Sequence, residues 1–403
     1  MFKKKILLNN FLLKSKTYYK NLKKTEKIFK SFTFEYENFE IPILYSYEEN
    51  FNLNFSPPII KKFYKYKNII IIGMGGSILG TKSIYSFFKN KIRKNLFFFD
   101  NLDQDLYKKF KKIKNIKNSC FIIVSKSGNT LETIINFVTI FSKSLMKNKL
   151  VFITENKDNI LNNFANELNA EIIEHREFVG GRYSVLSEAG MFPAALMGLS
   201  VKKFGNLNGL LKNKQFVSCL LSNVANIYTL NQKKMSTSVI LNYDSCLNDL
   251  GYWYQQLVGE SLGKKGKGFT PFLSPAPKDH HSLLQLYLEG RKDKFFTFFS
   301  TETKKVEKKI KGTIIPKEIK FIKNKNLSSI INAQCEATQK IFKNRNIPFR
   351  HFVFKKKSEE ELGLIFTFFV LETILLAKLM DVNPFDQPAV EEVKIETKKI
   401  ISK

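Results

Sequence analysis

The sequence predicts an α/β protein built from two doubly wound parallel sheets, each in a three-layer αβα arrangement. Three observations support this prediction: apolar runs of strand length recur, helical patterns follow them, and Gly- or Ser-rich corners join the two. An unbroken apolar run is typical of a strand that helices cover on both faces. With 403 residues, 43% of them apolar, the chain can bury a large core and is expected to form two domains.

The first domain is expected over residues 41–205, where strand and helix patterns alternate. NIIII (68–72) turns through GMGG into the helical pattern SILGTKSIYSFF, and CFIIV (120–124) turns through SKSGNT into IINFVTIFSKSL. KLVFIT (149–154) is a third strand pattern, followed by the helical pattern ILNNFANEL and the short strand AEIIEH. A Gly-rich turn and a small-residue helix complete the domain at 177–196. Right-handed crossovers should place these strands in one parallel sheet.

The second domain is expected over residues 206–403, with a second αβ series and C-terminal helices. Its predicted strands are STSVIL, KFFTFFS and FRHFVF, and its predicted helices are SCLNDLGYWYQQLVGESLG, DHHSLLQLYLEG, NLSSIINAQCEATQKIFKNR, the segment 361–380 and a last helix after NPFDQP. Residues 1–40 are expected to form a helical leader. MFKKKILLNNFLLKSK begins like a secretory signal, but Asn9 and Asn10 interrupt its apolar core and no small-residue cleavage site follows, so an amphipathic helix is expected there.

The segment LGLIFTFFVLETILLAKL (362–379) is the most membrane-like part of the sequence. Glu372 and Lys378 interrupt it short of the roughly 18 apolar residues that a membrane span requires. Ser358 and Glu361 form the S-x-x-E pattern of a capping box at its start. We therefore expect a buried core helix and no membrane partner.

The net charge of +30 admits two interpretations. A nucleic acid or an acidic membrane could bind so basic a chain. Lysines are instead spread evenly, as in KKKI (3–6) and KKVEKKIK (304–311), and Arg, which nucleic-acid sites often use, is scarce. This distribution favours a compositional preference for Lys, Asn, Ile and Phe, with Lys on solvated helix faces, and no nucleic-acid partner.

The four cysteines, Cys120, Cys219, Cys246 and Cys335, are scattered without a C-x-x-C spacing. Three of them lie in apolar or helical patterns, which favours buried free thiols over disulfides or zinc ligands. Because free thiols indicate a reducing compartment, a cytoplasmic location is expected.

Two strand-to-helix corners in the first domain are suited to binding an anion. GMGGS (73–77) allows a ligand to approach the backbone closely, because Gly has no Cβ. SKSGNT offers free N–H groups at a helix N-terminus together with the Lys126 charge. It also offers the hydroxyls of Ser125, Ser127 and Thr130. In a doubly wound sheet both corners lie at the carboxyl ends of strands, where ligands bind. Two ordinary tight turns are the alternative interpretation.

Neither corner matches a nucleotide-binding motif. GMGGSILG has Ile78 at its sixth position, where G-x-G-x-x-G requires Gly. SKSGNT lacks the G-K-[ST] of a Walker loop. The anion is therefore expected to be a single sugar-phosphate group rather than a dinucleotide.

Further polar positions are candidates for chemistry. Glu260 lies at a helix end in QQLVGESLGKKGKG, where a carboxylate is either a base or simply a solvated charge. Arg182 follows two glycines in VGGRYS and can either reach a negative group or form a surface ion pair. His280 and His281 are adjacent, and side chains at i and i+1 cannot face one site on a helix, so a two-histidine metal site is not expected. One of the two histidines is expected to be oriented for use.

Six sequence blocks together resemble the phosphoglucose isomerase family, in its shorter bacterial form. They occur in the family's order over residues 73–394 and are GMGGSILG, SKSGNTLET, FVGGRYSVLSEAG, YQQLVGESLGKK, PKDHHSLLQL and FDQPAVEEVK. The resemblance implies two sugar-isomerase (SIS-type) α/β domains and a homodimer. It also implies the isomerisation of glucose 6-phosphate and fructose 6-phosphate, a step of glycolysis and gluconeogenesis, without a metal or cofactor.

The resemblance further implies roles for individual residues. It makes Glu260 the base and places Arg182 beside the developing enediolate. It assigns ring opening to His281, supplied across the dimer interface, and it brings Lys394 to the ring-oxygen region with Gln387 near it. The residues that it implies in holding the phosphate and the sugar are Gly76, Ser77, Ser125, Lys126, Ser127, Thr130 and Gln256.

Two positions depart from the family pattern. His280 stands where many relatives have Gln before the catalytic histidine, and Asn129 stands where Thr is often found, which removes one hydroxyl from the phosphate corner. Two alternative functions remain open: an isomerase that also accepts mannose 6-phosphate, and a non-catalytic sugar-phosphate sensor. A sensor would not need Glu260, Arg182 and Lys394 together, and it would normally carry a helix-turn-helix region, for which no pattern is recognised.

Overall fold

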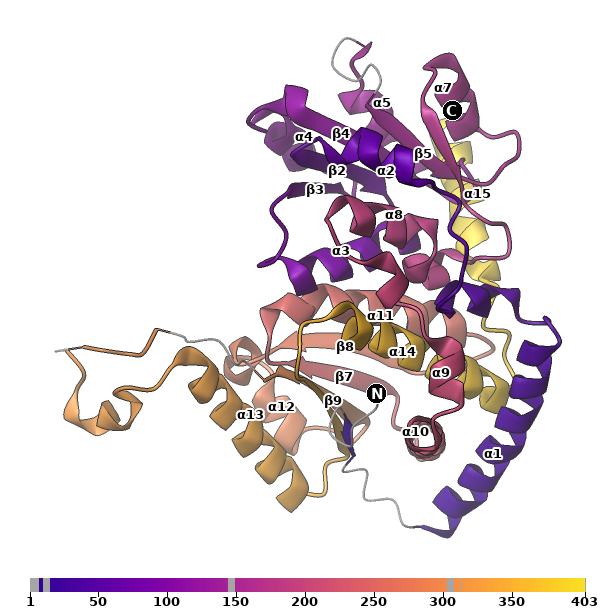
Figure 1. Ribbon diagram of the computed structural model, residues 1–403. Helices are drawn as coiled ribbons and strands as arrows, with labels where there is room; N and C mark the ends of the chain where they lie inside the picture. The colour runs from indigo at the N-terminus through magenta and orange to yellow at the C-terminus, as the bar shows by residue number, and fades with distance from the viewer. Residues whose placement is uncertain (1–6, 10–14, 144–148, 303–307, 313, 403) are drawn as a thin grey trace.

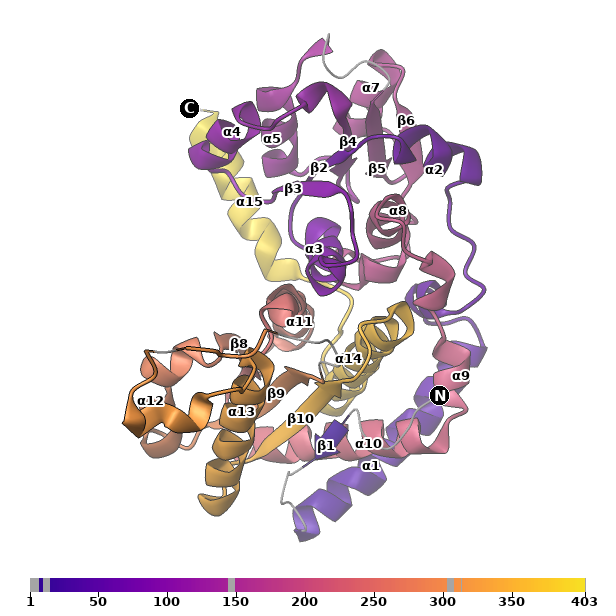
Figure 2. The ribbon, with the colours of Figure 1, turned by 60° about the vertical axis from the view of Figure 1, so that its left-hand side comes forward.

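The computed structural model describes residues 7–9, 15–143, 149–302, 308–312 and 314–402. Two five-stranded sheets form two halves, which lie one above the other in Figure 1. Helices cover both faces of each sheet (Figures 1 and 2). The predicted α/β class with parallel sheets is therefore confirmed.

The first sheet is entirely parallel and has the strand order β3-β2-β4-β5-β6. The chain enters the sheet at β2, moves outward to β3, and then crosses to β4 on the other side of β2. The order therefore reverses between β2 and β4, and doubly wound sheets bind ligands outside the strand ends at such a switch point. The strands are β2 (Asn68–Gly73), β3 (Asn95–Phe99), β4 (Ser119–Val124), β5 (Leu150–Thr154) and β6 (Glu171–Glu174).

The second sheet repeats this plan. Its strand order is β1-β10-β9-β7-β8, in which β7 to β10 are parallel and β1 pairs antiparallel with β10. Counted from β7, the parallel strands follow the same order as β2 to β5 of the first sheet. The strands are β1 (Leu7–Asn9), β7 (Thr237–Asn242), β8 (Thr270–Pro275), β9 (Lys294–Thr301) and β10 (Phe349–Phe354).

Helices follow most strands, and several begin at an asparagine. Asn159, Asn213 and Asn326 each accept a hydrogen bond from the backbone N–H three residues later, which satisfies a donor of the first helical turn. The helices associated with the first sheet are α2 (Pro57–Tyr64), α3 (Gly76–Phe88), α4 (Gln104–Lys111), α5 (Leu131–Ile140), α7 (Ile160–Glu167) and α8 (Glu188–Leu196). The others are α1 (Lys16–Glu37), α9 (Leu207–Leu211), α10 (Lys214–Gln232), α11 (Asn248–Leu262), α12 (Leu284–Glu289), α13 (Leu327–Asn344), α14 (Glu359–Met380) and α15 (Pro388–Ile401).

The N-terminal segment differs from its expected form. Leu7–Asn9 form strand β1 rather than part of an amphipathic helix, because the outer edge of β10 accepts a further strand. α1 is helical, as expected, but it packs against α10 and α14 and so lies with the second half rather than forming a separate leader. The rest of the expected helix, residues 1–6 and 10–14, lies outside the described residues.

Other differences concern short elements. β3 and β8 lack a clear signal in the sequence, since NLFFF is short and TPFLSP contains two prolines. The expected helix DHHSLLQLYLEG is divided into the 3-10 turn η6 (Lys278–His281) and the short helix α12. The strands expected from long apolar runs all form.

α14 is a buried core helix, as expected. Among the described helices it alone has the length and hydropathy of a membrane span, and 89% of its most apolar window is buried in the structure. Buried Glu372 receives hydrogen bonds from both terminal nitrogens of Arg350 on β10, so its charge is neutralised inside the core. Ser358 accepts a hydrogen bond from the N–H of Glu361 and so caps the helix start.

α11 joins the two halves. It packs against α3 of the first half and against β8 and α14 of the second half, at the centre of Figure 2. Its buried Trp253 and Tyr254 contact Phe366 and Phe369 of α14, with ring centroids 4.7 and 4.8 Å apart. A side chain on the last turn of α11 therefore lies at the junction of the two halves.

Candidate active site

The two Gly- and Ser-rich corners leave the first sheet side by side. β2 and β4 are hydrogen-bonded neighbours, with Gly73 opposite Val124 at their carboxyl ends. GMGGS and SKSGNT therefore start at the same edge, at the switch point of the sheet. Ser77 lies half-buried in the first turn of α3, directly beyond the first corner.

Gly75 and Gly76 allow two other segments to approach the first corner. Gly75 has a φ of +51°, and a Cβ at this position would lie 2.7 Å from Nε2 of Gln256. A Cβ at Gly76 would lie 2.1 Å from the carbonyl carbon of Gly181. Because non-bonded carbon atoms cannot approach so closely, a side chain at position 76 would displace the VGGR segment. The corner thus contacts both α11 and the segment that carries Arg182.

SKSGNT forms a compact turn at the start of α5. Oγ of buried Ser125 lies 2.8 Å from Oγ1 of Thr130, the N-cap residue of α5. Gly128 has a φ of +67°, and a Cβ there would lie 1.9 Å from Oδ1 of Asn159. Ser127 is exposed at the tip of the turn. Because the first N–H groups of a helix have no partner within it, these N–H groups and the hydroxyls form a donor set for one anion.

Lys126 has a carboxylate partner beside this corner. Its Nζ lies 3.5 Å from Oε1 of Glu155, which is buried directly after β5 and also pairs with Lys157. Asn129, the departure from the family pattern, accepts a hydrogen bond of 3.1 Å from the N–H of Ile160. Its side chain therefore caps the first turn of α7 instead of facing an anion.

Glu260 lies on the last turn of α11, and two neighbours hold its carboxylate. Gln256, one turn earlier, donates from Nε2 to Oε1 of Glu260 at 3.0 Å. Nη1 of Arg182 lies 3.1 Å from Oε2, and the Arg182 side chain is 4% exposed while that of Glu260 is 29% exposed. The structure thus brings the three predicted residues together, and Arg182 does not form a surface ion pair.

The Arg182 guanidinium bridges two segments. It lies in the 3-10 turn η3 (Gly181–Leu186), and its Nη2 donates to the backbone carbonyl of Asp386 at 2.8 Å. Within the part of the chain that the structure describes, Nη1 has no hydrogen-bond partner of good geometry, although it is within ion-pair distance of Glu260. The guanidinium therefore retains a donor for an oxygen of a ligand.

The two adjacent histidines have different environments. Nε2 of His280 lies 2.7 Å from the hydroxyl of Tyr243, and burial lowers the pKa of His280. His281 is exposed on η6, which follows β8. Among the described residues, no hydrogen bond or ion pair joins His281 to Glu260. The structure therefore does not bring His281 into contact with Glu260 within the described residues.

Gln387 and Lys394 belong to the last helix. Gln387 is the exposed N-cap residue of α15, and it directly follows the Asp386 carbonyl that Arg182 contacts. α15 starts at the junction of the two halves and runs along the first half (Figures 1 and 2). Lys394 is exposed and pairs with Glu391 at 2.6 Å. The structure therefore brings the start of α15 to Arg182 but leaves Lys394 with Glu391.

Two charged residues of the site have no distinct signal in the sequence. Lys264 and Asp386 form an ion pair of 2.8 Å beside Arg182. Both lie inside blocks that resemble the family, GESLGK and FDQP, yet nothing in either block indicates that the two side chains meet. Their contact depends on how the end of α11 packs against the segment between α14 and α15.

The assembled groups suit proton transfer beside a developing negative charge. A carboxylate can lift a proton and return it, and a fixed guanidinium stabilises an oxygen that becomes negative. Among the described residues, no three His, Cys, Asp or Glu side chains lie close enough together to hold a metal ion.

Two doubly wound halves, two Gly- and Ser-rich corners at the switch point of the first, and a carboxylate of the second half paired with Arg182 of the first are features of the two-domain phosphosugar isomerase class. The sequence profile of phosphoglucose isomerase matches residues 60–271. Glucose-6-phosphate isomerase of Methanocaldococcus jannaschii is 34% identical over 348 residues, which are 83% of this chain and 84% of the relative. The chain belongs to the phosphoglucose isomerase family.

Solved structures have the same fold. A hypothetical protein of Thermus thermophilus superposes with a TM-score of 0.85 at 22% identity, over 98% of this chain and 99% of the other. A glucose-6-phosphate isomerase of Chlamydia trachomatis superposes with a TM-score of 0.69 at 19% identity, over 86% of this chain and 72% of the other. At these identities the similarity establishes the shared fold.

Proposed function

We propose that the protein interconverts glucose 6-phosphate and fructose 6-phosphate through a cis-enediol intermediate. The observation that carries this proposal is the position of Glu260, whose carboxylate is held by Arg182 and Gln256 beside the Gly75–Gly76 corner. Relatives that match over most of the chain are named glucose-6-phosphate isomerase. Their names favour this activity over the two alternatives, an isomerase that also accepts mannose 6-phosphate and a non-catalytic sugar-phosphate sensor.

Glu260 acts as the base in this reaction. Its carboxylate takes the proton from C2 and returns it to C1, and one group on one face of the substrate can do both. Positioned proton transfer of this kind contributes roughly 10²–10⁴-fold to the rate. Arg182 stabilises the negative charge that develops on the enediolate oxygen. Because a guanidinium does not give up its proton, it cannot neutralise the base.

The phosphate group provides binding energy without reacting. The corner at the start of α5 holds it, so that C1 and C2 of the sugar lie against Glu260. The close contact between Gly76 and Gly181 holds the neighbouring GMGGS corner against the segment that carries Arg182. The proposed contacts of the phosphate and the sugar are Gly76, Ser77, Ser125, Lys126, Ser127, Thr130 and Gln256.

Ring opening requires an acid and a base near the ring oxygen. We assign it to His281 and Lys394, with Gln387 close by, and Lys394 exchanges Glu391 for the substrate. His281 is exposed on its own chain, which supports a homodimer in which it serves the site of the other copy. The cysteines are free thiols, which supports a cytoplasmic location.

A coupled assay with fructose 6-phosphate in the presence of a chelator tests the proposal. We expect glucose 6-phosphate to form at a rate that the chelator does not change. A folded protein that forms no glucose 6-phosphate would contradict the isomerase activity. Loss of activity only on chelation would contradict the metal-free proton transfer.

A further inference from the structure

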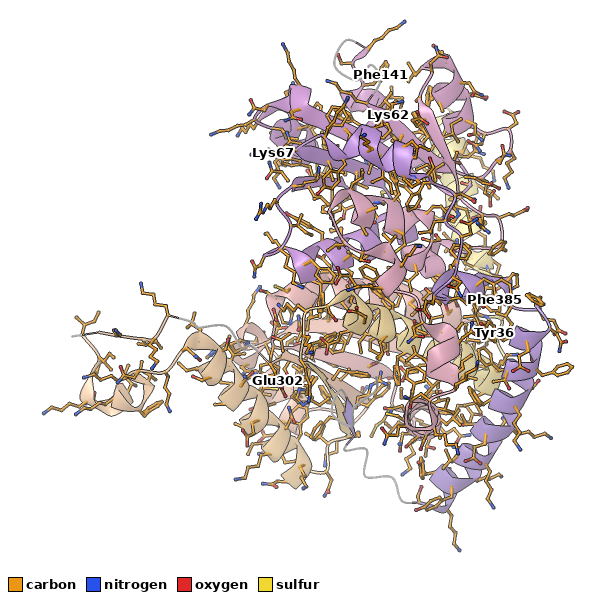
Figure 3. All side chains as sticks on the ribbon, in the orientation of Figure 1. Tyr36, Lys62, Lys67, Phe141, Glu302 and Phe385 are labelled. Atoms are coloured by element: carbon orange, nitrogen blue, oxygen red, sulfur yellow. The ribbon has the colours of Figure 1, made fainter. Side chains whose placement is uncertain are left out.

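We infer that Lys264 is a positioning residue for the isomerisation, because through Asp386 it holds the loop that orients Arg182 against Glu260. This inference rests on the proposed function. The loop consists of residues 383–386, between α14 and α15. Phe385 of this loop lies at the side of the molecule, at the level of the junction between the two halves (Figure 3).

Side chains from both halves hold the carbonyl groups of this loop. The hydroxyl of Tyr183 donates to the carbonyl of Pro384 at 2.9 Å, and Arg182 donates to that of Asp386 at 2.8 Å. Both donors come from η3 in the first half. Lys264, directly beyond the end of α11, donates to the carbonyl of Asn383 from the other side. The loop is thus clamped between η3 and α11.

Lys264 also makes the ionic contact of the loop. Its side chain is 13% exposed, and its Nζ lies 2.8 Å from Oδ1 of Asp386. Oδ2 of the same carboxylate accepts a hydrogen bond of 3.1 Å from Asn383. The hydrogen bond from Lys264 is the main reason that the pKa of Asp386 lies below its usual value, so the carboxylate is charged at neutral pH. A nearly buried ammonium fixes a carboxylate more firmly than an exposed one does.

These contacts close a ring around the base. Glu260 contacts Arg182, Arg182 contacts the Asp386 backbone, and the Asp386 side chain contacts Lys264. Lys264 lies four residues after Glu260 in the sequence, so the ring returns to the end of α11. Without Lys264 only the contacts from η3 hold the loop, so the Asp386 carbonyl is less firmly placed and the guanidinium can turn away from Glu260.

The kinetic constant that changes when Lys264 is replaced distinguishes a positioning role from a role in substrate binding. Arg182 stabilises charge that exists only in the transition state, whereas the phosphate corner lies on a different element of the first half. A misdirected guanidinium should therefore lower kcat and leave the KM for fructose 6-phosphate and the inhibition constant of inorganic phosphate nearly unchanged. A small displacement of a catalytic group can lower the rate by about 10- to 100-fold.

The test compares Lys264→Met, Asp386→Asn and the double variant in the full-length protein. We expect each single variant to lower kcat about 10-fold or more, with KM changed by less than about twofold, and the double variant to be no slower than the slower single one. Lys264→Arg should restore most of the activity. Lys267→Met is the matched control, because Lys267 donates to the carbonyl of Met380 nearby and does not contact Asp386.

The outcomes separate this inference from the proposed function. An unsubstituted protein without isomerase activity contradicts the proposed function itself. An active protein in which Lys264→Met keeps its kcat, or raises only KM, contradicts the positioning role, as does full additivity in the double variant. If Lys264→Met does not fold, the kinetics of Asp386→Asn alone test the positioning role. Asp386 is half exposed, so its replacement should not prevent folding, and it removes the same ion pair.

Discussion

Nη1 of Arg182 and Oε2 of Glu260 are 3.1 Å apart, although the two residues belong to different halves of the molecule. The guanidinium comes from η3 beside the first sheet, and the carboxylate comes from the last turn of α11. The packing of the two halves thus brings together the proposed base and the proposed stabilising cation.

Replacing Glu260 by Gln should remove turnover and retain binding. The amide keeps the shape of the side chain but cannot accept the proton from C2, so kcat should fall by about 10²–10⁴-fold. The KM for fructose 6-phosphate should change by only a few-fold, since the phosphate corner is intact. Glu360→Gln is the control, because Glu360 is an exposed glutamate whose partner is Lys203. A Glu260→Gln variant with normal kcat would exclude this residue as the base.

Replacing His281 by Ala should impair ring opening specifically. Activity on the cyclic substrate should fall, and an open-chain substrate should rescue His281→Ala more than it rescues Glu260→Gln. In a homodimer that shares His281 between copies, mixing the two inactive variants should regenerate some complete sites. Equal deficits on cyclic and open-chain substrates would rule out a role in ring opening, and mixtures without any regained activity would rule out sharing.

Two glycine substitutions should have opposite effects. Gly76→Ala places a Cβ 2.1 Å from the Gly181 carbonyl carbon, so we expect a loss of about 1–3 kcal/mol in the free energy of unfolding and a loss of activity. Gly259→Ala meets nothing within 4 Å and lies inside α11, so it should stabilise the protein by roughly 0.5–1 kcal/mol. Urea unfolding measures both values. A neutral Gly76→Ala would mean that the two glycine segments do not touch.

Stability should fall as the pH is lowered from 6.5 towards 4. Burial lowers the pKa values of His175 and His351 to about 4, whereas an unfolded histidine titrates near 6.5. Between pH 4 and 6.5, these two histidines bind protons in the unfolded chain but not in the folded chain. The free energy of unfolding should therefore decrease by up to about 1.4 kcal/mol per pH unit for each histidine. His351→Gln should reduce this slope.

Breaking the buried ion pair between Arg350 of β10 and Glu372 of α14 should cost much stability, whereas replacing both residues should cost little. Glu372→Leu leaves the Arg350 guanidinium buried without a counter-charge, so we expect a loss of about 3–5 kcal/mol in the free energy of unfolding. The double variant Arg350→Met, Glu372→Leu should regain most of this loss, because both charges are then absent. Urea unfolding of the unsubstituted protein and the two variants gives the comparison. A double variant as unstable as Glu372→Leu would show that the pair itself stabilises the fold.

The sequence predicts those parts of the fold that depend on local pattern. Strands such as β2 and β4 have unbroken apolar runs, and these are recognisable without knowledge of the neighbours. β1 cannot be predicted from its own three residues, because it forms by pairing with the edge of β10. β8 contains two prolines, which suggest a turn rather than a strand. The division into two halves is predictable because strand and helix patterns alternate in each of two successive parts of the sequence.

The contacts of the site can likewise be predicted from the sequence only where they are local. Gln256 and Glu260 are four residues apart on one helix, so their contact follows from helical spacing. The contacts of Arg182 with Glu260 and with Asp386 join segments that are distant in the sequence, and only the packing of the halves creates them. The resemblance to the family supplies the residue types, but it does not supply the ion pairs of Lys126 and Lys394 with nearby carboxylates.

The helix that bears Glu260 packs against α3 of one half and α14 of the other. A hinge motion between the halves would therefore have to break the packing of α11 against one of them. The distance between Glu260 and Arg182 is thus coupled to the relative position of the two halves.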